Sequence, residues 1–303
     1  SNRELLSIFG MIQDGWKKIP RHPSVDKVGR LGEPGPGIRT FHTYGDEILV
    51  GYGDYNKNTG PVDLYSFNKN TFEWKKYAEN LETEAIVHFV DMGDEAVALF
   101  VDPLGHKYWE HTSLGMRVSD GFIFPDVNLI HAFDGCELPD GSWWIVGSGW
   151  SDDTSTYDTY CGFLSHDRGE SWGTYPMVID GDTTISRRFY LADSYNGKPL
   201  AYSPDLGAYI LDNGEYIKVD DYVVEPGYEF GNWEFQSLDV SNPPTPYNIK
   251  DFSGEHFYVT ATFDDNSTYY AGTSTGDIYY THRLVATYVE NKGYTPAPPD
   301  GRE

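Results

Sequence analysis

The chain has 303 residues, of which 16% are aromatic and 32 are glycine, a composition typical of short strands and turns rather than of helices. Its formal net charge of −25 argues against nucleic acid or an anionic membrane surface as a partner. The sequence has no apolar run of the roughly 18 residues that a transmembrane helix needs, and it shows no classical signal peptide.

The N-terminal residues predict one amphipathic helix followed by a short strand. Apolar residues at helical spacing are Leu5, Leu6, Ile8, Phe9, Ile12 and Trp16. The run Trp16–Ile19 (WKKI) is similar to Trp74–Tyr77 (WKKY), the expected outer strand of the first repeat described below. We therefore expect an N-terminal strand that pairs with C-terminal strands and closes a ring, with chance likeness as the alternative. Pro20–Gly37 is then expected to be a surface connector.

A repeated pattern occupies residues 38–284: an apolar run, a glycine turn, a second apolar run and an Asp. The turn glycines, spaced 48, 48, 56 and 57 residues apart, are Gly45, Gly93, Gly141, Gly197 and Gly254. A second hairpin follows each, with expected turns at Asn68–Thr71, Ser113–Gly115, Asp167–Gly169, Asp212–Gly214 and Thr275–Gly276. Two hairpins make the four strands of a propeller blade, and the period is typical of blades.

The predicted fold is therefore all-β: a single β-propeller of five four-stranded blades with short N- and C-terminal arms. Six blades are the alternative, because Tyr222–Asn242 is long enough to hold further strands. A β-sandwich is less consistent with five aligned glycine turns. The expected organisation is an N-terminal arm, closure segment and linker (1–37), the propeller (38–284) and a Pro-rich C-terminal tail (285–303).

The residue types of one turn, Ser165–Trp172 (SHDRGESW), predict its local hydrogen bonds and backbone conformation. Ser165 and Asp167 are expected to bind backbone amides in a tight turn, and Gly169 to supply a positive φ. Trp172 is expected to pack under the next blade. The two cysteines, Cys136 and Cys161, fall on strands that are not neighbours, so we expect free thiols. No Cys–His spacing predicts a metal site.

An Asp follows the second strand of each unit, and these residues are Asp54, Asp102, Asp152, Asp205 and Asp264. Asp often starts a loop because its side chain binds nearby backbone. Alternatively, a ring of carboxylates at the channel mouth could hold Ca²⁺ or supply the acid and nucleophile of a glycosidase. The loop Trp150–Tyr160 joins carboxylates to aromatic rings, as sugar-binding sites do.

No catalytic residue can be assigned, and no cofactor is expected apart from the Ca²⁺ alternative. Candidate ligand-binding residues are Asp54, Tyr55, Trp150, Asp152, Asp153, Tyr157, Asp205 and Asp264. The expected first strands also carry His42, His88, His131 and Arg188, which we interpret as packing residues more readily than as bases.

The pattern S-x-D-x-G-x-x-W at Ser165, Asp167, Gly169 and Trp172, together with the repeats, resembles the Asp-box (BNR-repeat) propellers of the sialidase-like superfamily. In that family the motif is structural and lies away from the active site. The resemblance also implies an arginine triad for the substrate carboxylate. That triad cannot be placed, since only Arg39, Arg187 and Arg188 lie near first strands.

The segment Gly51–Pro61 (GYGDYNKNTGP), with the acidic, Tyr-rich composition, is similar to propeller proteins of tailed-phage virions. This resemblance implies a non-enzymatic virion protein on a capsid or tail, made in the host cytoplasm, whose N- and C-terminal arms bind other virion subunits and whose loops bind host-surface glycan. A glycoside hydrolase and a free-standing lectin, with an extracellular location, are the alternatives.

Overall fold

The computed structural model describes residues 17–104, 111–154, 156–182, 184, 187–224, 238–239, 256–259, 263–264 and 268–282. The chain divides into two compact units. The first unit comprises Ser1–Gly53, Asp63–Lys76 and Gly231–Glu303, and the second comprises Asp54–Val62 and Tyr77–Phe230. The predicted N-terminal helix, the Gly254 turn and the C-terminal tail lie outside the described residues.

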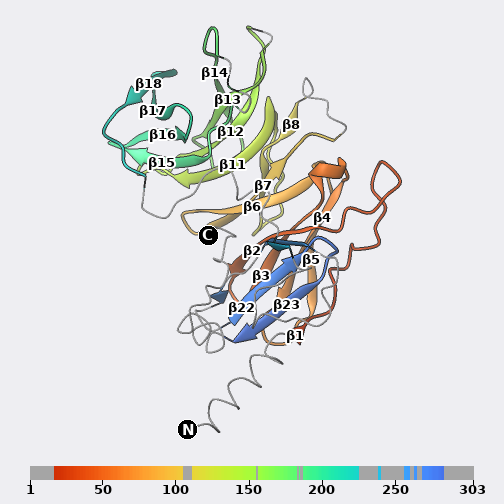
Figure 1. The fold of residues 1–303 in the computed structure, drawn as a ribbon. Helices are drawn as coiled ribbons and strands as arrows, with labels where there is room; N and C mark the ends of the chain where they lie inside the picture. Colours follow the sequence, from red (N-terminus) through yellow and green to blue (C-terminus); the bar gives the residue numbers. More distant parts are fainter. Residues whose placement is uncertain are drawn as a thin grey trace. The chain divides into compact units, whose positions relative to one another are not determined.

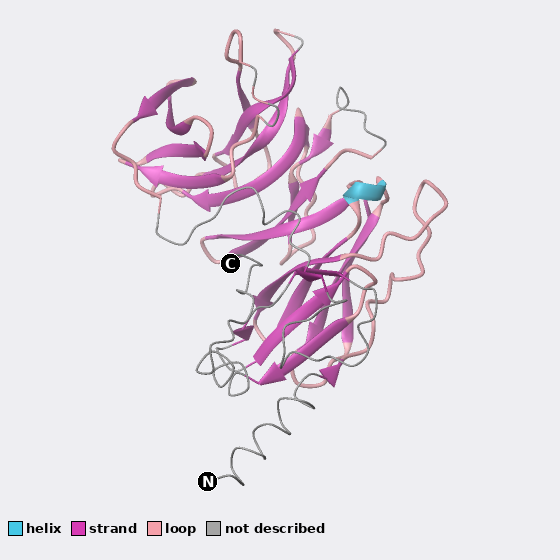
Figure 2. Cartoon of the chain, viewed as in Figure 1, coloured by secondary structure: helices cyan, strands magenta, loops and turns pink. Residues whose placement is uncertain are grey.

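The first meander is a four-stranded antiparallel sheet in chain order: β2 (Ile38–Tyr44), β3 (Glu47–Tyr52), β4 (Val62–Asn68) and β5 (Trp74–Leu81). The turn at Gly45 and the turn at Asn68–Thr71 join its strands where the sequence predicts them. A short 3-10 turn, η1 (Tyr55–Lys57), lies between β3 and β4 and is the single helical segment of the described residues (Figure 2).

The last meander also belongs to the first unit, and the N-terminus completes it. Its strands are β19 (Leu238–Asp239), β20 (His256–Val259), β21 (Phe263–Asp264), β22 (Thr268–Thr273) and β23 (Ile278–His282). β1 (Lys17–Lys18) pairs antiparallel with β23, so that Lys17 lies opposite Tyr280. The predicted pairing of an N-terminal strand with C-terminal strands is confirmed.

The connector after β1 is only partly the expected surface segment: Val28 and Leu31 are exposed, but other side chains are buried. His22 and Ser24 are buried, and the His22 ring stacks on Tyr52 with ring centroids 3.9 Å apart. Ser24 donates a hydrogen bond of 2.8 Å to the buried carboxylate of Asp63. Proline and glycine mark an irregular path, but they do not reveal that the side chains between them fill the core.

In the second unit, the first meander contains β6 (Ala85–Met92), β7 (Glu95–Val101) and β9 (Gly115–Arg117), and the pairing of Val101 with His131 joins it to the next meander in one sheet. β8 (Thr112–Ser113) pairs with β10 (Asp126–Val127). The second turn of this repeat was predicted at Ser113–Gly115, which is wrong. The chain reverses after Arg117 instead, because Arg117 N–H donates to Phe122 O and Gly121 N–H donates to Arg117 O, both at 3.0 Å.

Two further four-stranded meanders complete the described part of the second unit (Figure 1). One is β11 (Leu129–Glu137), β12 (Trp143–Ser151), β13 (Thr156–Ser165) and β14 (Gly173–Met177). The other is β15 (Leu191–Tyr195), β16 (Lys198–Ser203), β17 (Gly207–Asp212) and β18 (Glu215–Val219). β11 contacts β6 and β15, the first strands of the neighbouring meanders, and in the first unit β2 contacts β20.

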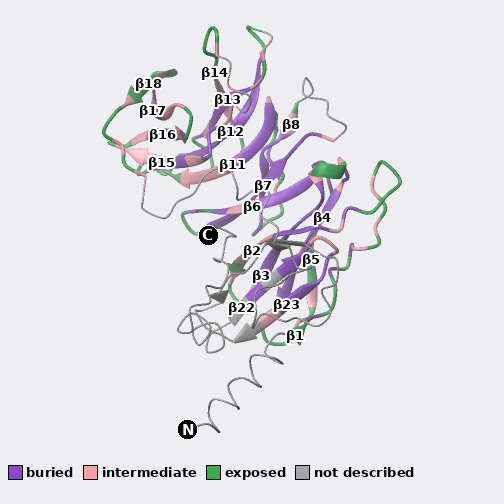
Figure 3. Cartoon of the chain, viewed as in Figure 1, coloured by how far each residue is buried: buried purple, intermediate pink, exposed green. Residues whose placement is uncertain are grey.

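Burial is greatest in the second strand of each meander between β2 and β18 and is low in the last strand of the four-stranded meanders (Figure 3). Every residue of β7 and β12 is buried, whereas β5 and β18 are largely exposed. Meanders whose first strands meet and whose last strands face solvent are propeller blades, so the chain is an all-β protein of the β-propeller class. The number of blades stays a prediction. Among the described residues, no helix is long and apolar enough to cross a membrane.

Three of the first strands, β2, β6 and β11, share a bulge that the sequence pattern did not reveal. The pairing register shifts between Ile38 and Thr40, between Ile86 and His88, and between Leu129 and His131. A bulge adds one residue to a strand and re-aims the side chains beside it. In β11 this places His131 opposite Ser148 of β12.

Candidate functional site

A bulge between β12 and β13 shapes the end of the aromatic loop. Gly149 pairs with Thr159 and Ser151 pairs with Thr156, so Trp150 alone opposes both Tyr157 and Asp158. Asp158 adopts a positive φ of 51°. The bulge separates the two side chains: Tyr157 is 49% exposed, whereas Asp158 lies towards His131, with 4.0 Å between Asp158 Oδ1 and His131 Nδ1.

Three rings, which we name the Trp150 platform, gather at this bulge: His111, Trp150 and Tyr157. The centroid of Trp150 lies 5.2 Å from His111 and 6.4 Å from Tyr157, in stacked and tilted arrangements. Trp150 is only 7% exposed, so Tyr157 supplies most of the open ring surface of this pair. The backbone of Asn128 holds the loop, since Trp150 N–H donates to Asn128 O at 3.2 Å.

Carboxylates lie beside the platform. Asn128 Nδ2 donates a hydrogen bond of 3.0 Å to Asp152 Oδ2. Asp152 and Asp153 are both exposed. Three predicted candidates (Trp150, Asp152 and Tyr157) therefore fall together with Asn128, which the sequence analysis missed. Asn128 carried no signal of its own, because it meets Asp152 only through the pairing of β11 with β12.

His131 forms a second cluster on the inner strands. Its Nε2 lies 2.8 Å from Asp102 Oδ1, its Nδ1 lies 2.7 Å from Ser148 Oγ, and its ring stacks on Phe133 at 5.4 Å. The Asp–His–Ser set is similar in composition to a nucleophilic triad. Ser148, however, is 0% exposed, so its hydroxyl orients the imidazole and does not reach a substrate.

Phe133 is the centre of this inner cluster. The Arg188 guanidinium lies 5.5 Å from its ring centroid, and the rings of Tyr190 and His88 lie 4.9 and 6.4 Å away. Of the four first-strand residues singled out in the sequence, His88, His131 and Arg188 thus meet around one ring, and they pack as expected. His42 belongs to the first unit and is half-buried.

Asp134 is a carboxyl with altered acidity. Burial, opposed by the amides of Ala192 and Gly135 and reinforced by the Asp193 carboxylate, raises the pKa of Asp134 to about 7. Ala192 N–H donates to Asp134 Oδ2 at 2.8 Å, which joins β11 to β15. The neighbouring Cys136 thiol has its pKa raised to about 12, mainly by burial. Cys136 and Cys161 are both free, as predicted.

The turn Ser165–Trp172 has the predicted local bonds. Gly169 N–H donates to Ser165 Oγ and Ser171 N–H donates to Asp167 Oδ1, both at 2.8 Å, and Gly169 has a φ of +88°. Hydrogen bonds from Ser171 hold the pKa of Asp167 below its usual value. Trp172 was expected to pack under the next blade. It packs instead on Phe124 of the preceding repeat, 5.2 Å between ring centroids.

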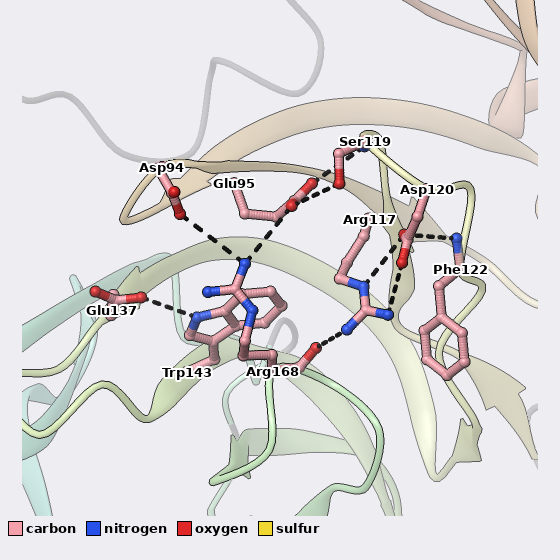
Figure 4. Close-up of polar contacts among 9 residues, drawn as sticks. All are labelled: Asp94, Glu95, Arg117, Ser119, Asp120, Phe122, Glu137, Trp143 and Arg168. Carbon is pink, nitrogen blue, oxygen red and sulfur yellow. Dashed lines mark hydrogen bonds and ion pairs between the residues drawn. The ribbon is translucent and has the colours of Figure 1, made fainter.

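A polar network ties this turn to the preceding sheet (Figure 4). Arg117 donates to Arg168 O at 3.0 Å and forms two bonds to Asp120. The Arg168 guanidinium lies 5.1 Å from the Trp143 ring and 3.7 Å from Glu95 Oε2. Glu95 in turn accepts from the amide and the hydroxyl of Ser119. Both guanidinium groups drawn here have carboxylate partners within the network, which indicates a structural clamp.

The remaining candidates are dispersed. Asp54 is 2% exposed and accepts from Lys57 N–H at 3.3 Å, so it caps its own loop, and Tyr55 follows it in η1. Asp205 is exposed beside Ser203, whose Oγ accepts from Asp205 N–H at 3.3 Å. The backbone of Asp264 pairs with Thr268. Within the described ranges, no group of three or more His, Cys, Asp or Glu side chains could hold a metal ion.

Comparison with known proteins gives distant structural likenesses. No family model matches the chain. No curated protein matches it either. The Dos1 propeller is similar over 80% of this chain, with 12% identity and a TM-score of 0.41, and the chain spans 54% of that structure. A gluconolactonase-like propeller is similar over 88% of this chain and 98% of its own, with 11% identity and a TM-score of 0.37.

Proposed function

We propose that the protein is a non-enzymatic, carbohydrate-binding propeller whose sugar site is the Trp150 platform. The exposed ring of Tyr157 beside Trp150 is the observation that carries the proposal. An open aromatic face stacks on the C–H face of a sugar, while Asp152 and Asn128 offer hydrogen-bonding groups for its hydroxyls.

The inner cluster supplies no accessible serine nucleophile. A nucleophile must be reachable by the substrate, and Ser148 is fully buried behind His131. The virion setting remains part of the proposal on the strength of the phage-like sequence alone. It would place the platform where a particle meets host-surface glycan.

The test is a glycan array followed by calorimetry of the best binder. Tyr157→Ala should weaken binding about tenfold, because a well-stacked ring contributes roughly 0.5–1.5 kcal/mol beyond its buried area. Tyr195→Ala, at a half-buried tyrosine of β15, is the matched control and should bind normally. A protein that binds no glycan, or equal affinity in both variants, would exclude this function.

A glycoside hydrolase is the second candidate, favoured by one observation. A carboxyl with a pKa of about 7, such as Asp134, has the acidity of a general acid at neutral pH. Turnover of any neutral oligosaccharide that disappears in Asp134→Asn would establish this activity in place of simple binding.

A further inference from the structure

At the β12–β13 bulge, one polar atom of the Trp150 platform and one beside the platform are buried and lack a hydrogen-bond partner within the described part of the chain. They are the indole Nε1 of Trp150 and the carboxylate Oδ1 of Asp158. Trp150 itself is 93% buried, given its 7% exposure. Buried polar groups are almost always paired, so such atoms mark places where a ligand or ordered water completes the bonding.

The two atoms have opposite hydrogen-bonding character. An indole N–H only donates, and a carboxylate only accepts. Both residues lie at the same β12–β13 bulge, where Trp150 opposes the pair Tyr157–Asp158. A hydroxyl group both accepts and donates, so a ligand with neighbouring hydroxyls satisfies both atoms while its apolar face covers Tyr157.

The local charge selects among such ligands. Asp152 and Asp153 are exposed on the loop, and Asp158 and Asp102 flank His131. The guanidinium of Arg188 belongs to the inner cluster, where it lies over the ring of Phe133. An anionic sugar would bring its carboxylate among like charges, which disfavours its binding when it is desolvated.

We propose that the Trp150 platform binds a neutral sugar through adjacent hydroxyls, one accepting from Trp150 Nε1 and one donating to Asp158 Oδ1, and that it discriminates against acidic sugars. This inference rests on the proposed function and adds the ligand class and the two specifying groups. The platform thereby differs from a site in which arginines bind the carboxylate of an acidic sugar.

The experiment compares neutral trisaccharides (maltotriose, mannotriose and chitotriose) with 3′-sialyllactose and trigalacturonate by calorimetry. The best neutral probe should bind at least about tenfold more tightly than either acidic one. Trp150→Phe keeps an aromatic ring, although a smaller one, and removes the donor, so it should weaken that binding about tenfold. Asp158→Asn tolerates the positive φ and replaces a charge-assisted bond with a neutral one, so a loss of about three- to tenfold is expected.

Asp94→Asn is the matched control, because it removes one charge from a side chain 94% exposed at the β6–β7 turn and should leave binding unchanged. A measurement on the unaltered protein tests the same contact even if a variant fails to fold. The indole ¹⁵N–¹H signal of Trp150, identified by its loss in Trp150→Phe or by selective labelling, should shift on titration with the neutral probe.

The outcomes separate the two proposals. Binding that requires Tyr157 but leaves the Trp150 indole signal unshifted and is unaffected by Trp150→Phe and Asp158→Asn overturns the hydroxyl contacts while the carbohydrate site stands. A preference for sialyllactose or trigalacturonate overturns the neutral-ligand class. Absence of binding to every oligosaccharide removes the proposed function and this inference together.

Discussion

His22 is an imidazole held in an almost wholly aromatic environment in the first unit. Its ring lies parallel to Tyr52, within 4°, and meets the edges of Tyr65 and Trp74. Its Nδ1 accepts a 3.2 Å hydrogen bond from Ser24 N–H. Burial, only partly offset by the Asp63 carboxylate, lowers the pKa of His22 to about 3.

This lowered pKa predicts an acid-sensitive fold. The folded value lies below the ordinary value of 6.5, so the contribution of neutral His22 is fully present above about pH 6.5 and is lost as pH falls towards 3. Between those limits, His22 alone should lower the unfolding free energy by roughly 1.4 kcal/mol for each pH unit that the pH falls. Urea denaturation from pH 7 to 4.5 should show this extra slope in the native protein and not in His22→Phe. Equal slopes would contradict the assignment.

Asp167 predicts a smaller, local effect. Its carboxylate accepts from Ser171 N–H and Ser165 Oγ–H, so Asp167→Ala should lower the unfolding free energy by about 1 kcal/mol without altering glycan binding. Asp94→Ala, at an exposed turn, should change it by less than about 0.5 kcal/mol. Thermal melting of both variants provides the measurement, and an unchanged melting temperature for Asp167→Ala would disprove the role of the turn bonds.

The contrast between these residues shows what a sequence discloses at this scale. Asp167 and Ser165 bind amides within four residues, so their role could be predicted from spacing alone. His22 meets Tyr52, and Asp102 meets His131, only after strands pair. Nothing near His22 in the sequence distinguishes it from an exposed histidine. Likewise, nothing near Asn128 in the sequence indicates its hydrogen bond to Asp152.

At the scale of elements, the two-residue strand β1 is too short to hold by backbone pairing alone. Charged side chains reinforce it: Asp277 lies 2.8 Å from Arg21 Nε and 3.2 Å from Lys18 Nζ. Asp277 is nearly buried in the turn before β23, and Arg21 also donates to Thr275 O. The closure therefore combines the backbone pairing, the buried side chain of Ile19 and one carboxylate that two cations share.

Asp277→Asn should loosen this closure. We expect a loss of about 1–3 kcal/mol in unfolding free energy, because charge-assisted hydrogen bonds are weakened at a buried carboxylate. Amide hydrogen exchange of Tyr279 and Tyr280, opposite β1, should accelerate. Asp120→Asn, which affects the half-exposed Arg117–Asp120 pair, should cost less than about 1 kcal/mol. Unchanged exchange in β23 would show that backbone pairing suffices.

Most hairpins were predictable because glycine or asparagine stands at turns with positive φ, as at Gly45, Gly93 and Gly197. The second hairpin of the second repeat was not. Ser113 and Gly115 look like a turn, but Gly115 lies against Ala98 backbone inside the sheet, while the reversal follows at Gly121. A glycine required by close packing cannot be told from a turn glycine by residue type.

At the scale of the whole molecule, the repeat predicted the propeller class because each unit repeats its own hairpins. The spacing does not determine how many blades complete the fold, since β19 already falls within the stretch Tyr222–Asn242 that the sequence left open. The candidate site was only partly predictable. The aromatic loop followed from composition, whereas the bulge that orients Tyr157 and Asp158 followed from strand register.

The last prediction concerns the chain ends, which the virion proposal assigns to assembly. Deleting Ser1–Ile12 removes six large apolar residues and leaves β1 at Lys17–Lys18, so the propeller should keep its melting temperature. Incorporation into particles should be lost, because such an apolar cluster is costly to leave in water and is best buried against a partner. Removing Tyr294–Glu303 should have a weaker effect, as less apolar surface is involved.

Purified particles from cells that supply only the truncated chain provide the measurement. Unfolding of the Ser1–Ile12 deletion would mean that these residues belong to the core of the first unit. Normal folding with normal incorporation would transfer the partner contact to another surface, and the loop Trp150–Tyr160 would be the next to test. In that case Tyr157→Ala should reduce incorporation as well as glycan binding, because one exposed ring would serve both contacts.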